Sequence, residues 1–279
     1  MDVADLDDDG DMDVLACGRQ DNLVLWYEND GSTPINWTEH IIDNTLFYPI
    51  TCLFAYINND NFLDVVACGG TIGEVVWYEN SGGITITWTR HTIDINGADG
   101  TFTVEVGDLN GDDYLDVAVT GRDQNNVYWC ENNLPDPNWT KHLIDNNVEW
   151  ACVVDITDVD LDSDLDLMVS GRDENAVVWY QNNLPNSWTR NDIDSSFTQA
   201  NGVWAYDIDG DADPDAVAGA WLETGKIVWY DNPTIPSFPQ IPDFLVNENP
   251  GPEDEDQGHS CICIDDSGYF VIAWVDERN

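Results

Sequence analysis

Aspartates on alternate residues of one short loop are the side chains in this sequence best suited to chemistry. The stretch Asp5-Leu6-Asp7-Asp8-Asp9-Gly10-Asp11-Met12-Asp13 places carboxylates at loop positions 1, 3, 5 and 9, with Asp5 as position 1. At this spacing the side chains of a tight turn can converge on one hard cation such as Ca²⁺, which prefers oxygen ligands. The backbone carbonyl of position 7, Asp11, can add an oxygen, and Gly10 permits a left-handed turn. The stretch therefore predicts a calcium-binding loop.

The residues after this loop indicate what it connects. The spacing matches the start of an EF-hand loop, but the bidentate Glu of position 12 is missing. The chain continues with the apolar run Val14-Leu15-Ala16-Cys17-Gly18, which is typical of a strand and not of an amphipathic helix. We therefore expect a calcium loop that joins two strands.

The loop recurs along the chain, and its first position falls at residues 5, 56, 108, 158 and 207. A period of about 50 residues indicates a repeat architecture. The ligands expected in the later complete copies are Asp108, Asn110, Asp112 and Asp116; Asp158, Asp160, Asp162 and Asp166; and Asp207, Asp209, Asp211 and Asp215. The second copy begins with Tyr56 and offers only Asn58, Asp60 and Asp64, so its site is expected to be weak or empty.

Each repeat carries four stretches that are typical of strands. An apolar strand enters the loop, and a second apolar strand leaves it. The third has an aromatic signature such as Leu25-Trp26-Tyr27-Glu28-Asn29, and the fourth alternates apolar and polar residues, as in 37–43. Without helical periodicity, the chain is predicted to be all-β: a β-propeller of four-stranded antiparallel blades, with about five repeats and a C-terminal half-unit.

The domain organisation follows from where this pattern stops. We expect propeller blades over residues 1–232, a proline-rich linker over 233–252, and a β-hairpin over 253–279. The hairpin is either a half-blade of a different repeat or the start of a next domain. Since the first repeat begins inside its own first strand and no signal peptide is present, we expect a piece of a longer secreted protein.

The loops, their period and the strand that follows them resemble the FG-GAP/VCBS repeat family. This family comprises the calcium-loop β-propellers of the integrin α-subunit head and of many secreted bacterial proteins. The resemblance covers about residues 1–232 and implies one Ca²⁺ in each of four loops, with a degraded fifth site.

Three features depart from the family pattern. Gly is absent from position 6 of the later loops, where Asp113, Ser163 and Ala212 stand. The second loop lacks a carboxylate at position 1. The family usually closes with seven blades, and this chain supplies five.

Composition restricts the possible partners. A net charge of −47, with only 8 Lys and Arg residues, excludes a nucleic-acid backbone or an anionic membrane as a partner. Disorder is disfavoured by 42% hydrophobic residues and 13 Trp. No apolar run is long enough for membrane insertion. Crowded carboxylates repel one another, so bound cations are expected to relieve strain in the folded chain.

The cysteines suggest packing more than metal binding. Cys17 and Cys68 occupy one repeat position that elsewhere holds a small residue, so buried thiols are expected. If the second repeat forms a hairpin around Asp60, Cys52 and Cys68 would face each other, and a disulfide could join them.

Three further sets of residues recur at fixed repeat positions. The Trp residues of the third strands are expected to pack between blades, and His residues one blade apart cannot share a metal. Arg residues that follow Gly in equivalent loops are expected to form loop-to-loop ion pairs on one rim, with an anion-binding rim as the alternative. These sets are Trp26, Trp77, Trp129, Trp179 and Trp229; His40, His91 and His142; and Arg19, Arg122 and Arg172.

No catalytic motif stands out, because Gly-x-Ser-x-Gly, HExxH and phosphate-binding Gly loops are missing. The sequence predicts a non-enzymatic, calcium-binding module of a bacterium, extracellular or at the cell surface, used for adhesion or assembly. Expected partners are extracellular proteins, glycans or further copies of the chain, which could form a self-assembling surface filament. The alternative is a carbohydrate-binding or carbohydrate-active propeller similar to a polysaccharide lyase.

Overall fold

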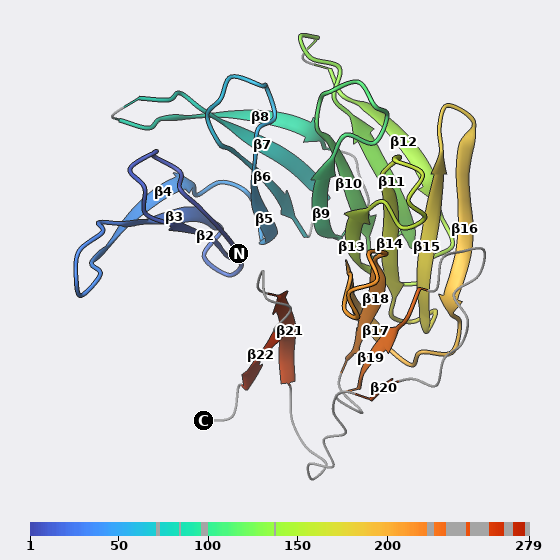
Figure 1. The fold of residues 1–279 in the computed structure, drawn as a ribbon. Coiled ribbons are helices and arrows are strands. Elements are labelled where there is room, and N and C mark those ends of the chain that lie inside the picture. Colours follow the sequence, from blue (N-terminus) through green and yellow to red (C-terminus); the bar gives the residue numbers. More distant parts are fainter. Residues whose placement is uncertain are drawn as a thin grey trace. The chain divides into compact units, whose positions relative to one another are not determined.

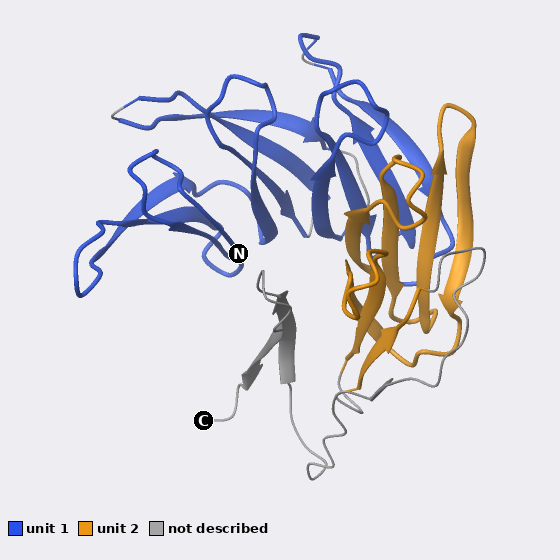
Figure 2. Ribbon diagram, in the orientation of Figure 1, with its two compact units in different colours: residues 1–151 blue, residues 152–279 orange. Residues whose placement is uncertain are grey.

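The computed structural model describes residues 1–70, 73–83, 85–95, 100–136, 138–221 and 226–232, and the backbone of strands at 244–245, 257–264 and 270–276. Every regular element in these residues is a β-strand. Within the same residues, no helix has the length and apolar character needed to cross a membrane. The chain divides into two compact units, residues 1–151 and 152–279 (Figure 2).

Unit 1 holds three four-stranded antiparallel sheets, one for each repeat, and each sheet follows the order of the chain (Figure 1). The first sheet contains β1 (Asp2–Ala4), β2 (Asp13–Gly18), β3 (Leu23–Asn29) and β4 (Trp37–Asp43). The second contains β5 (Pro49–Ala55), β6 (Asp64–Gly69), β7 (Glu74–Asn80) and β8 (Trp88–Asp94). The third contains β9 (Thr101–Gly107), β10 (Asp116–Gly121), β11 (Asn126–Glu131) and β12 (Thr140–Asp145).

Unit 2 repeats this plan, and the unit boundary falls at the start of its first strand. One sheet contains β13 (Ala151–Thr157), β14 (Asp166–Gly171), β15 (Ala176–Asn183) and β16 (Ser187–Asp194). The next contains β17 (Ala200–Tyr206), β18 (Asp215–Ala220), β19 (Ile227–Tyr230) and β20 (Phe244–Leu245). A separate antiparallel pair consists of β21 (Gln257–Ile264) and β22 (Phe270–Asp276).

The burial of each strand follows its place in the sheet. The second strands β6, β10 and β14 are buried at every residue, because both of their faces are covered. The fourth strands keep exposed residues along their length, as expected from their alternating sequence. The third and fourth strands shift register at equivalent points, between Val24 and Leu25 in the first sheet and between Val75 and Val76 in the second.

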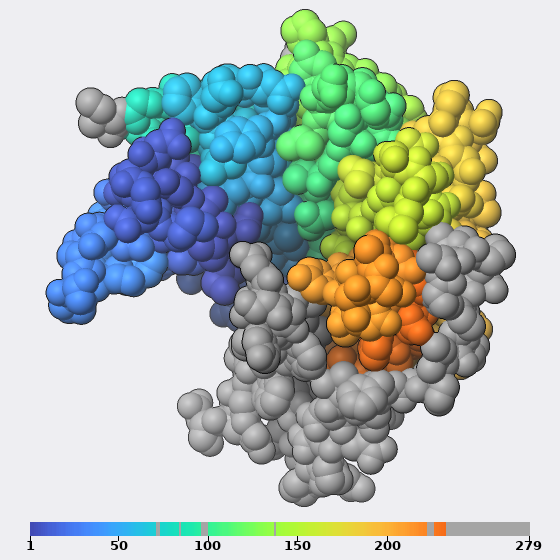
Figure 3. Space-filling view, in the orientation of Figure 1, coloured from blue at the N-terminus to red at the C-terminus, as the bar shows by residue number. Residues whose placement is uncertain are grey.

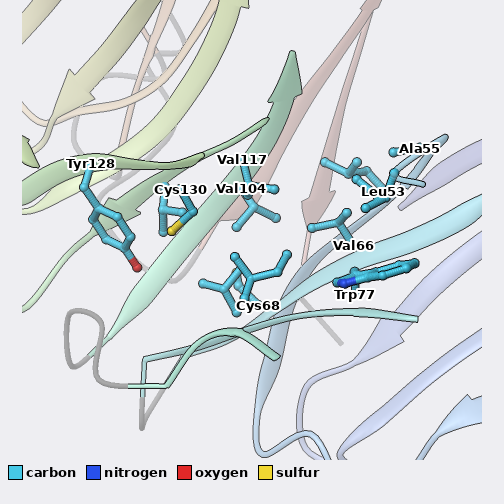
Figure 4. Packing of buried hydrophobic residues seen from close by; sticks show 13 residues of the cluster. Leu53, Ala55, Val66, Cys68, Trp77, Val104, Val117, Tyr128 and Cys130 are labelled. Carbon is cyan, nitrogen blue, oxygen red and sulfur yellow. The ribbon is translucent and has the colours of Figure 1, made fainter. Parts of the chain in front are cut away.

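Within unit 1, consecutive repeats lie beside one another (Figure 3), and apolar clusters join their sheets. One cluster combines Leu15 and Trp26 of the first sheet with Phe54 and Tyr78 of the second. A second cluster joins the second and third sheets, and Figure 4 shows Trp77, Cys68 and Val104 among its members. The third-strand Trp residues 26, 77, 129 and 179 are buried, as their predicted packing role requires, whereas Trp229 of the fifth repeat is half-buried.

One expectation about the C-terminal part needs adjustment. The fifth repeat has a fourth strand, because β20 pairs with β19 through Val228 opposite Leu245 and Trp229 opposite Phe244. This strand lies within residues 233–252, where the proline content had predicted only a linker. The expected hairpin is present as the β21–β22 pair, while its predicted Asp-Ser-Gly turn lies outside the described residues.

Candidate metal centre

The position-1 carboxylate organises each complete loop by accepting backbone N–H groups. Asp5 accepts from the amides of Asp9 at 3.1 Å and Gly10 at 3.0 Å. Asp158 accepts from the equivalent amides of Asp162 and Ser163 at 3.1 and 2.9 Å. Asp108 and Asp207 make the same pair of bonds and also accept from position 4. The loop therefore closes around its own first carboxylate, as Asx-turns do.

Two residues of every loop adopt left-handed backbone conformations. Position 6 does so as predicted, and position 4 does so as well. At position 4, Gly occurs in the third and fifth loops, so glycine has changed place and is not simply lost. The φ angles at positions 4 and 6 are 60° and 96° for Asp8 and Gly10, 58° and 70° for Asn59 and Asn61, 76° and 69° for Gly111 and Asp113, 58° and 78° for Leu161 and Ser163, and 83° and 80° for Gly210 and Ala212.

The position-9 aspartate is fully buried in all five repeats and forms a lock with the third strand. In the first repeat, Asp13 accepts the amide of Leu6 at 3.0 Å and that of Asn29 at 2.9 Å. The Asn29 side chain in turn donates to the carbonyl of Met12 at 3.2 Å. We call this arrangement the Asp–Asn lock. Its Asp and Asn members are Asp13 and Asn29, Asp64 and Asn80, Asp116 and Asn132, Asp166 and Asn182, and Asp215 and Asn232.

Carboxylate oxygens converge in three of the loops. They lie within 4.8 Å of one another in the groups Asp5, Asp7 and Asp9; Asp158, Asp160 and Asp166; Asp207, Asp209 and Asp215; and Asp209, Asp211 and Asp231. All of these donors are oxygens, which suits Ca²⁺ and disfavours softer metals.

The position-3 carboxylates provide an independent test of whether a cation fits. The Oδ1 atoms of Asp7 and Asp160 are buried and accept no hydrogen bond from the described residues. A buried carboxylate oxygen without a partner is costly, and a cation would supply the missing interaction. Burial raises the pKa of Asp7, and repulsion from Asp9 and Asp13 raises it further. The residues present therefore fit a hard divalent cation.

The second and third loops differ from this arrangement. In the second loop, Tyr56 has no carboxylate to accept hydrogen bonds from the loop's backbone amides. The side-chain amide of Asn58 donates to Asp60 at 3.0 Å. The expected ligands Asn58, Asp60 and Asp64 form no acidic cluster there. In the third loop, Asn110 donates to Asp112 at 3.1 Å, while Asp108 still accepts backbone amides of the loop.

The Asp11 side chain lies against Gly31 and not with Asp5, Asp7 and Asp9. The ligand expected from Asp11 is its backbone carbonyl, so that expectation stays a prediction. Asp13 is outside the first cluster, whereas Asp166 and Asp215, whose oxygens accept the equivalent lock amides, belong to the clusters of their loops.

Sequence reasoning missed an acidic position on the third strand. Glu131 Oε1 lies 3.5 Å from the Asn110 amide, Asp231 joins Asp209 and Asp211, and Gln181 donates to Asp160 at 2.5 Å. This third-strand position is the Glu of the recurring pattern Trp-Tyr-Glu-Asn, which the sequence shows. The pattern does not reveal that its side chain reaches the residue at loop position 3.

The same Glu pairs with the recurrent His. His40 lies 2.7 Å from Glu28 and stacks on Trp26 with ring centroids 4.4 Å apart, and the second and third repeats match it. The fourth repeat replaces both partners, with Gln181 for Glu and Asn191 for His. The structural role predicted for these histidines is confirmed.

The loop-to-loop ion pairs expected of the arginines stay a prediction, and the contacts seen are local or aromatic. Arg122 and Arg172 pair with the adjacent Asp123 and Asp173 at 2.8 and 3.1 Å. Contact with the next repeat is aromatic: the guanidinium carbons of Arg19 and Arg122 lie 4.4 and 5.1 Å from the ring centroids of Tyr48 and Trp150.

Comparison with known families agrees with this geometry. A family model described as an FG-GAP-like repeat matches residues 5–67 and 56–119. Residues 5–119 are thus similar to FG-GAP-like repeats, which supports a repeat family of this type. Both matches begin at position 1 of a loop and end in the strand after the next loop, so the matched FG-GAP-like unit has the period recognised in the sequence. A search of curated proteins found no match.

Proposed function

We propose that this chain is a calcium-stabilised β-propeller module that works outside the cell in adhesion or assembly. The observation that carries the proposal is the recurrence of closed acidic loops, in two of which the position-3 carboxylate, Asp7 or Asp160, has a buried oxygen without a partner among the described residues. Four-stranded antiparallel sheets joined through third-strand Trp residues support the propeller architecture.

The residues that would hold the ion in each complete loop are those of positions 1, 3, 5 and 9, which are aspartates except for Asn110 at position 3 of the third loop. Bound Ca²⁺ would supply positive charge that offsets the repulsion among the carboxylates. The position-1 carboxylate keeps the loop closed, and Glu131 and Gln181 of the third strands hydrogen-bond the position-3 side chains of their loops. This division supports a structural site, because the protein itself supplies many of the ligand oxygens.

A non-enzymatic role is supported by how the recurrent polar residues are used. The histidines stack on Trp and pair with Glu, and Arg122 and Arg172 pair with neighbouring aspartates. The extracellular location is supported by the loops, because calcium is abundant there. Partners would be other extracellular proteins, glycans or further copies of the chain. Ile41 and Leu143 occupy one repeat position on the outer strands and are 54% and 58% exposed, which supports contact with an apolar surface.

The test is a calcium titration followed by calorimetry on protein first treated with EGTA. About four ions should bind per chain, and the midpoint of thermal unfolding should rise markedly with calcium. The variant Asp160→Ala should lose one ion, because it removes the position-3 oxygen ligand of the fourth loop. The matched variant Asn58→Ala, at position 3 of the degraded second loop, should leave the stoichiometry unchanged.

Absence of calcium binding at millimolar concentration, with no change of the unfolding midpoint in EGTA, would contradict the proposal. Equal losses in Asp160→Ala and Asn58→Ala would contradict the assignment of the complete loops.

A further inference from the structure

Two cysteines from different repeats meet inside unit 1. Cys17 lies on β2 in the first sheet and Cys52 on β5 in the second, and both belong to the apolar cluster that joins these sheets. The Cys17 thiol donates to the carbonyl of Ile50 at 3.2 Å, which fixes it beside the strand that carries Cys52. The pair is not the one predicted from the sequence.

The predicted pair, Cys52 and Cys68, is excluded by the strand register. Cys52 stands opposite Ala67, and Thr51 stands opposite Cys68. Successive residues of a strand point to opposite faces, so the two thiols lie on opposite sides of the second sheet. Cys52 faces the first sheet, and Cys68 faces the third.

The two thiols of the Cys17–Cys52 pair differ in ways that suit a stepwise reaction. Cys17 is partly exposed, whereas Cys52 is 1% exposed. A hydrogen bond from Cys52 lowers the pKa of Cys17, and the same contact together with burial raises the pKa of Cys52. The accessible sulfur is thus the better nucleophile, and the buried sulfur is held next to it.

We propose that Cys17 and Cys52 form a redox-responsive dithiol that closes to a disulfide between the first and second repeats. The oxidant is a small disulfide such as oxidised glutathione. The Cys17 thiolate attacks one of its sulfurs, forming a mixed disulfide and releasing one glutathione thiolate. The Cys52 thiol then gives its proton to that thiolate and attacks the Cys17 sulfur, and the second glutathione leaves. Two protein thiols are oxidised while one glutathione disulfide is reduced.

Cys68 provides a matched control within the chain. It occupies the repeat position of Cys17 and donates in the same way to the carbonyl of Phe102, at 3.8 Å. However, the third repeat has Val104 at the position of Cys52, and Cys68 packs with it in the buried cluster (Figure 4). Burial raises the pKa of Cys68 to about 12. This thiol therefore has neither the partner nor the reactivity of Cys17.

The experiment treats the folded, full-length chain with oxidised glutathione in calcium buffer, blocks free thiols, and maps disulfides by mass spectrometry without reduction. Wild type and Cys68→Ser should each yield one Cys17–Cys52 peptide pair, with the mass of two hydrogen atoms lost. Cys17→Ser and Cys52→Ala should yield none. The midpoint of thermal unfolding should be several degrees higher in the oxidised wild type than in the reduced protein, since the bond restricts the unfolded chain.

A second measurement does not depend on any variant. Brief alkylation of the reduced native protein near neutral pH should label Cys17 many-fold faster than Cys68. Recovery of Cys17 and Cys52 as free thiols after oxidation, a disulfide that joins either of them to another cysteine, or equal labelling of Cys17 and Cys68 would overturn the proposal. The proposal does not depend on calcium binding, so its failure would leave the proposed function untouched.

Discussion

In some loops, a residue other than glycine adopts a strained left-handed backbone conformation. Ala212 has φ of 80° at position 6 of the fifth loop, in the left-handed region where a Cβ is unfavourable. Its backbone amide donates to Asp207, which holds the residue in place. The loop thus keeps its shape although glycine is missing.

Replacing Ala212 with Gly should therefore stabilise the protein by about 1 kcal/mol, because it removes a left-handed penalty of that size. Urea unfolding at fixed calcium measures the change. Gly210→Ala is the matched control two residues earlier: its φ is 83° and an added Cβ would meet no atom within 4 Å, so its loss of about 1 kcal/mol would be a pure backbone effect. Stabilisation by both substitutions would contradict this account.

The buried lock aspartates make stability depend on pH. Burial raises the pKa of Asp64 to about 7, above its ordinary value of 3.8 in the unfolded chain. Between these values the folded protein binds more protons, so the free energy of unfolding rises as pH falls from 8 to 5. This holds without calcium, which would compete with protons at the complete loops.

Asp64→Asn should make that pH dependence less steep in EGTA, because the amide has no proton to take up there. Asp116 and Asp166, whose pKa burial also raises to about 7, should retain the remaining slope. Asp64 is suited to this test because its loop lacks the position-1 carboxylate. Chemical unfolding at several pH values gives the slope for each protein, and an unchanged slope in the variant would show that Asp64 does not titrate in this range.

At the residue scale, the sequence predicted the ligand positions because carboxylate spacing in a tight turn is local information. It could not predict the Asp–Asn lock. Asn29 lies sixteen residues after Asp13, and only the pairing of β2 with β3 brings them together. The left-handed position 4 was also missed, since Asp8 and Leu161 give no sign of it.

At the element scale, the lock also links neighbouring sheets. The Asn132 side chain donates to Leu115 in its own repeat at 3.1 Å and to Ile57 of the preceding repeat at 3.0 Å. In unit 2, Asn232 makes the equivalent contact with Val159 at 3.0 Å. Asn80 serves as a comparison, because its side chain donates to the Leu63 carbonyl and accepts from the Gly82 amide, both within its own repeat.

Asn132→Ala should accordingly destabilise the protein more than Asn80→Ala, by about 1 kcal/mol, because it also leaves the buried Ile57 carbonyl without its donor. Chemical unfolding of the two variants at saturating calcium measures the difference. Equal losses would mean that the contact between sheets contributes nothing.

Strand positions were predictable because each repeat restates the same pattern. Register was not, and this is why Cys52 was matched with Cys68 instead of Cys17. The fourth strand of the fifth repeat was missed for a similar reason: Phe244 and Leu245 lie far from β19 in sequence and among prolines.

At the scale of the whole molecule, charge dominates the behaviour expected without cations. A net charge of −47 gives strong self-repulsion, much of it within the loops. In EGTA, the midpoint of thermal unfolding should rise as sodium chloride is increased from low ionic strength, because salt screens repulsion between exposed carboxylates. With saturating calcium the salt effect should be smaller. Scanning calorimetry at several salt concentrations tests both, and a midpoint that falls with salt in EGTA would contradict it.

The all-β architecture and the repeat count were readable from period and composition. The number of blades after closure was not, because closure depends on long-range contacts between repeats that no local pattern encodes.

The Asp–Asn lock has one more consequence, which concerns how such a chain changes over evolutionary time. The second repeat keeps its lock, with Asp64 accepting from Ile57 and Asn80 at 3.1 and 2.9 Å, although Tyr56 has replaced the first carboxylate. The framework of a repeat thus forms without a complete set of loop carboxylates. A duplicated unit can lose its ligands by drift, remain folded, and leave its loop free to acquire a different surface.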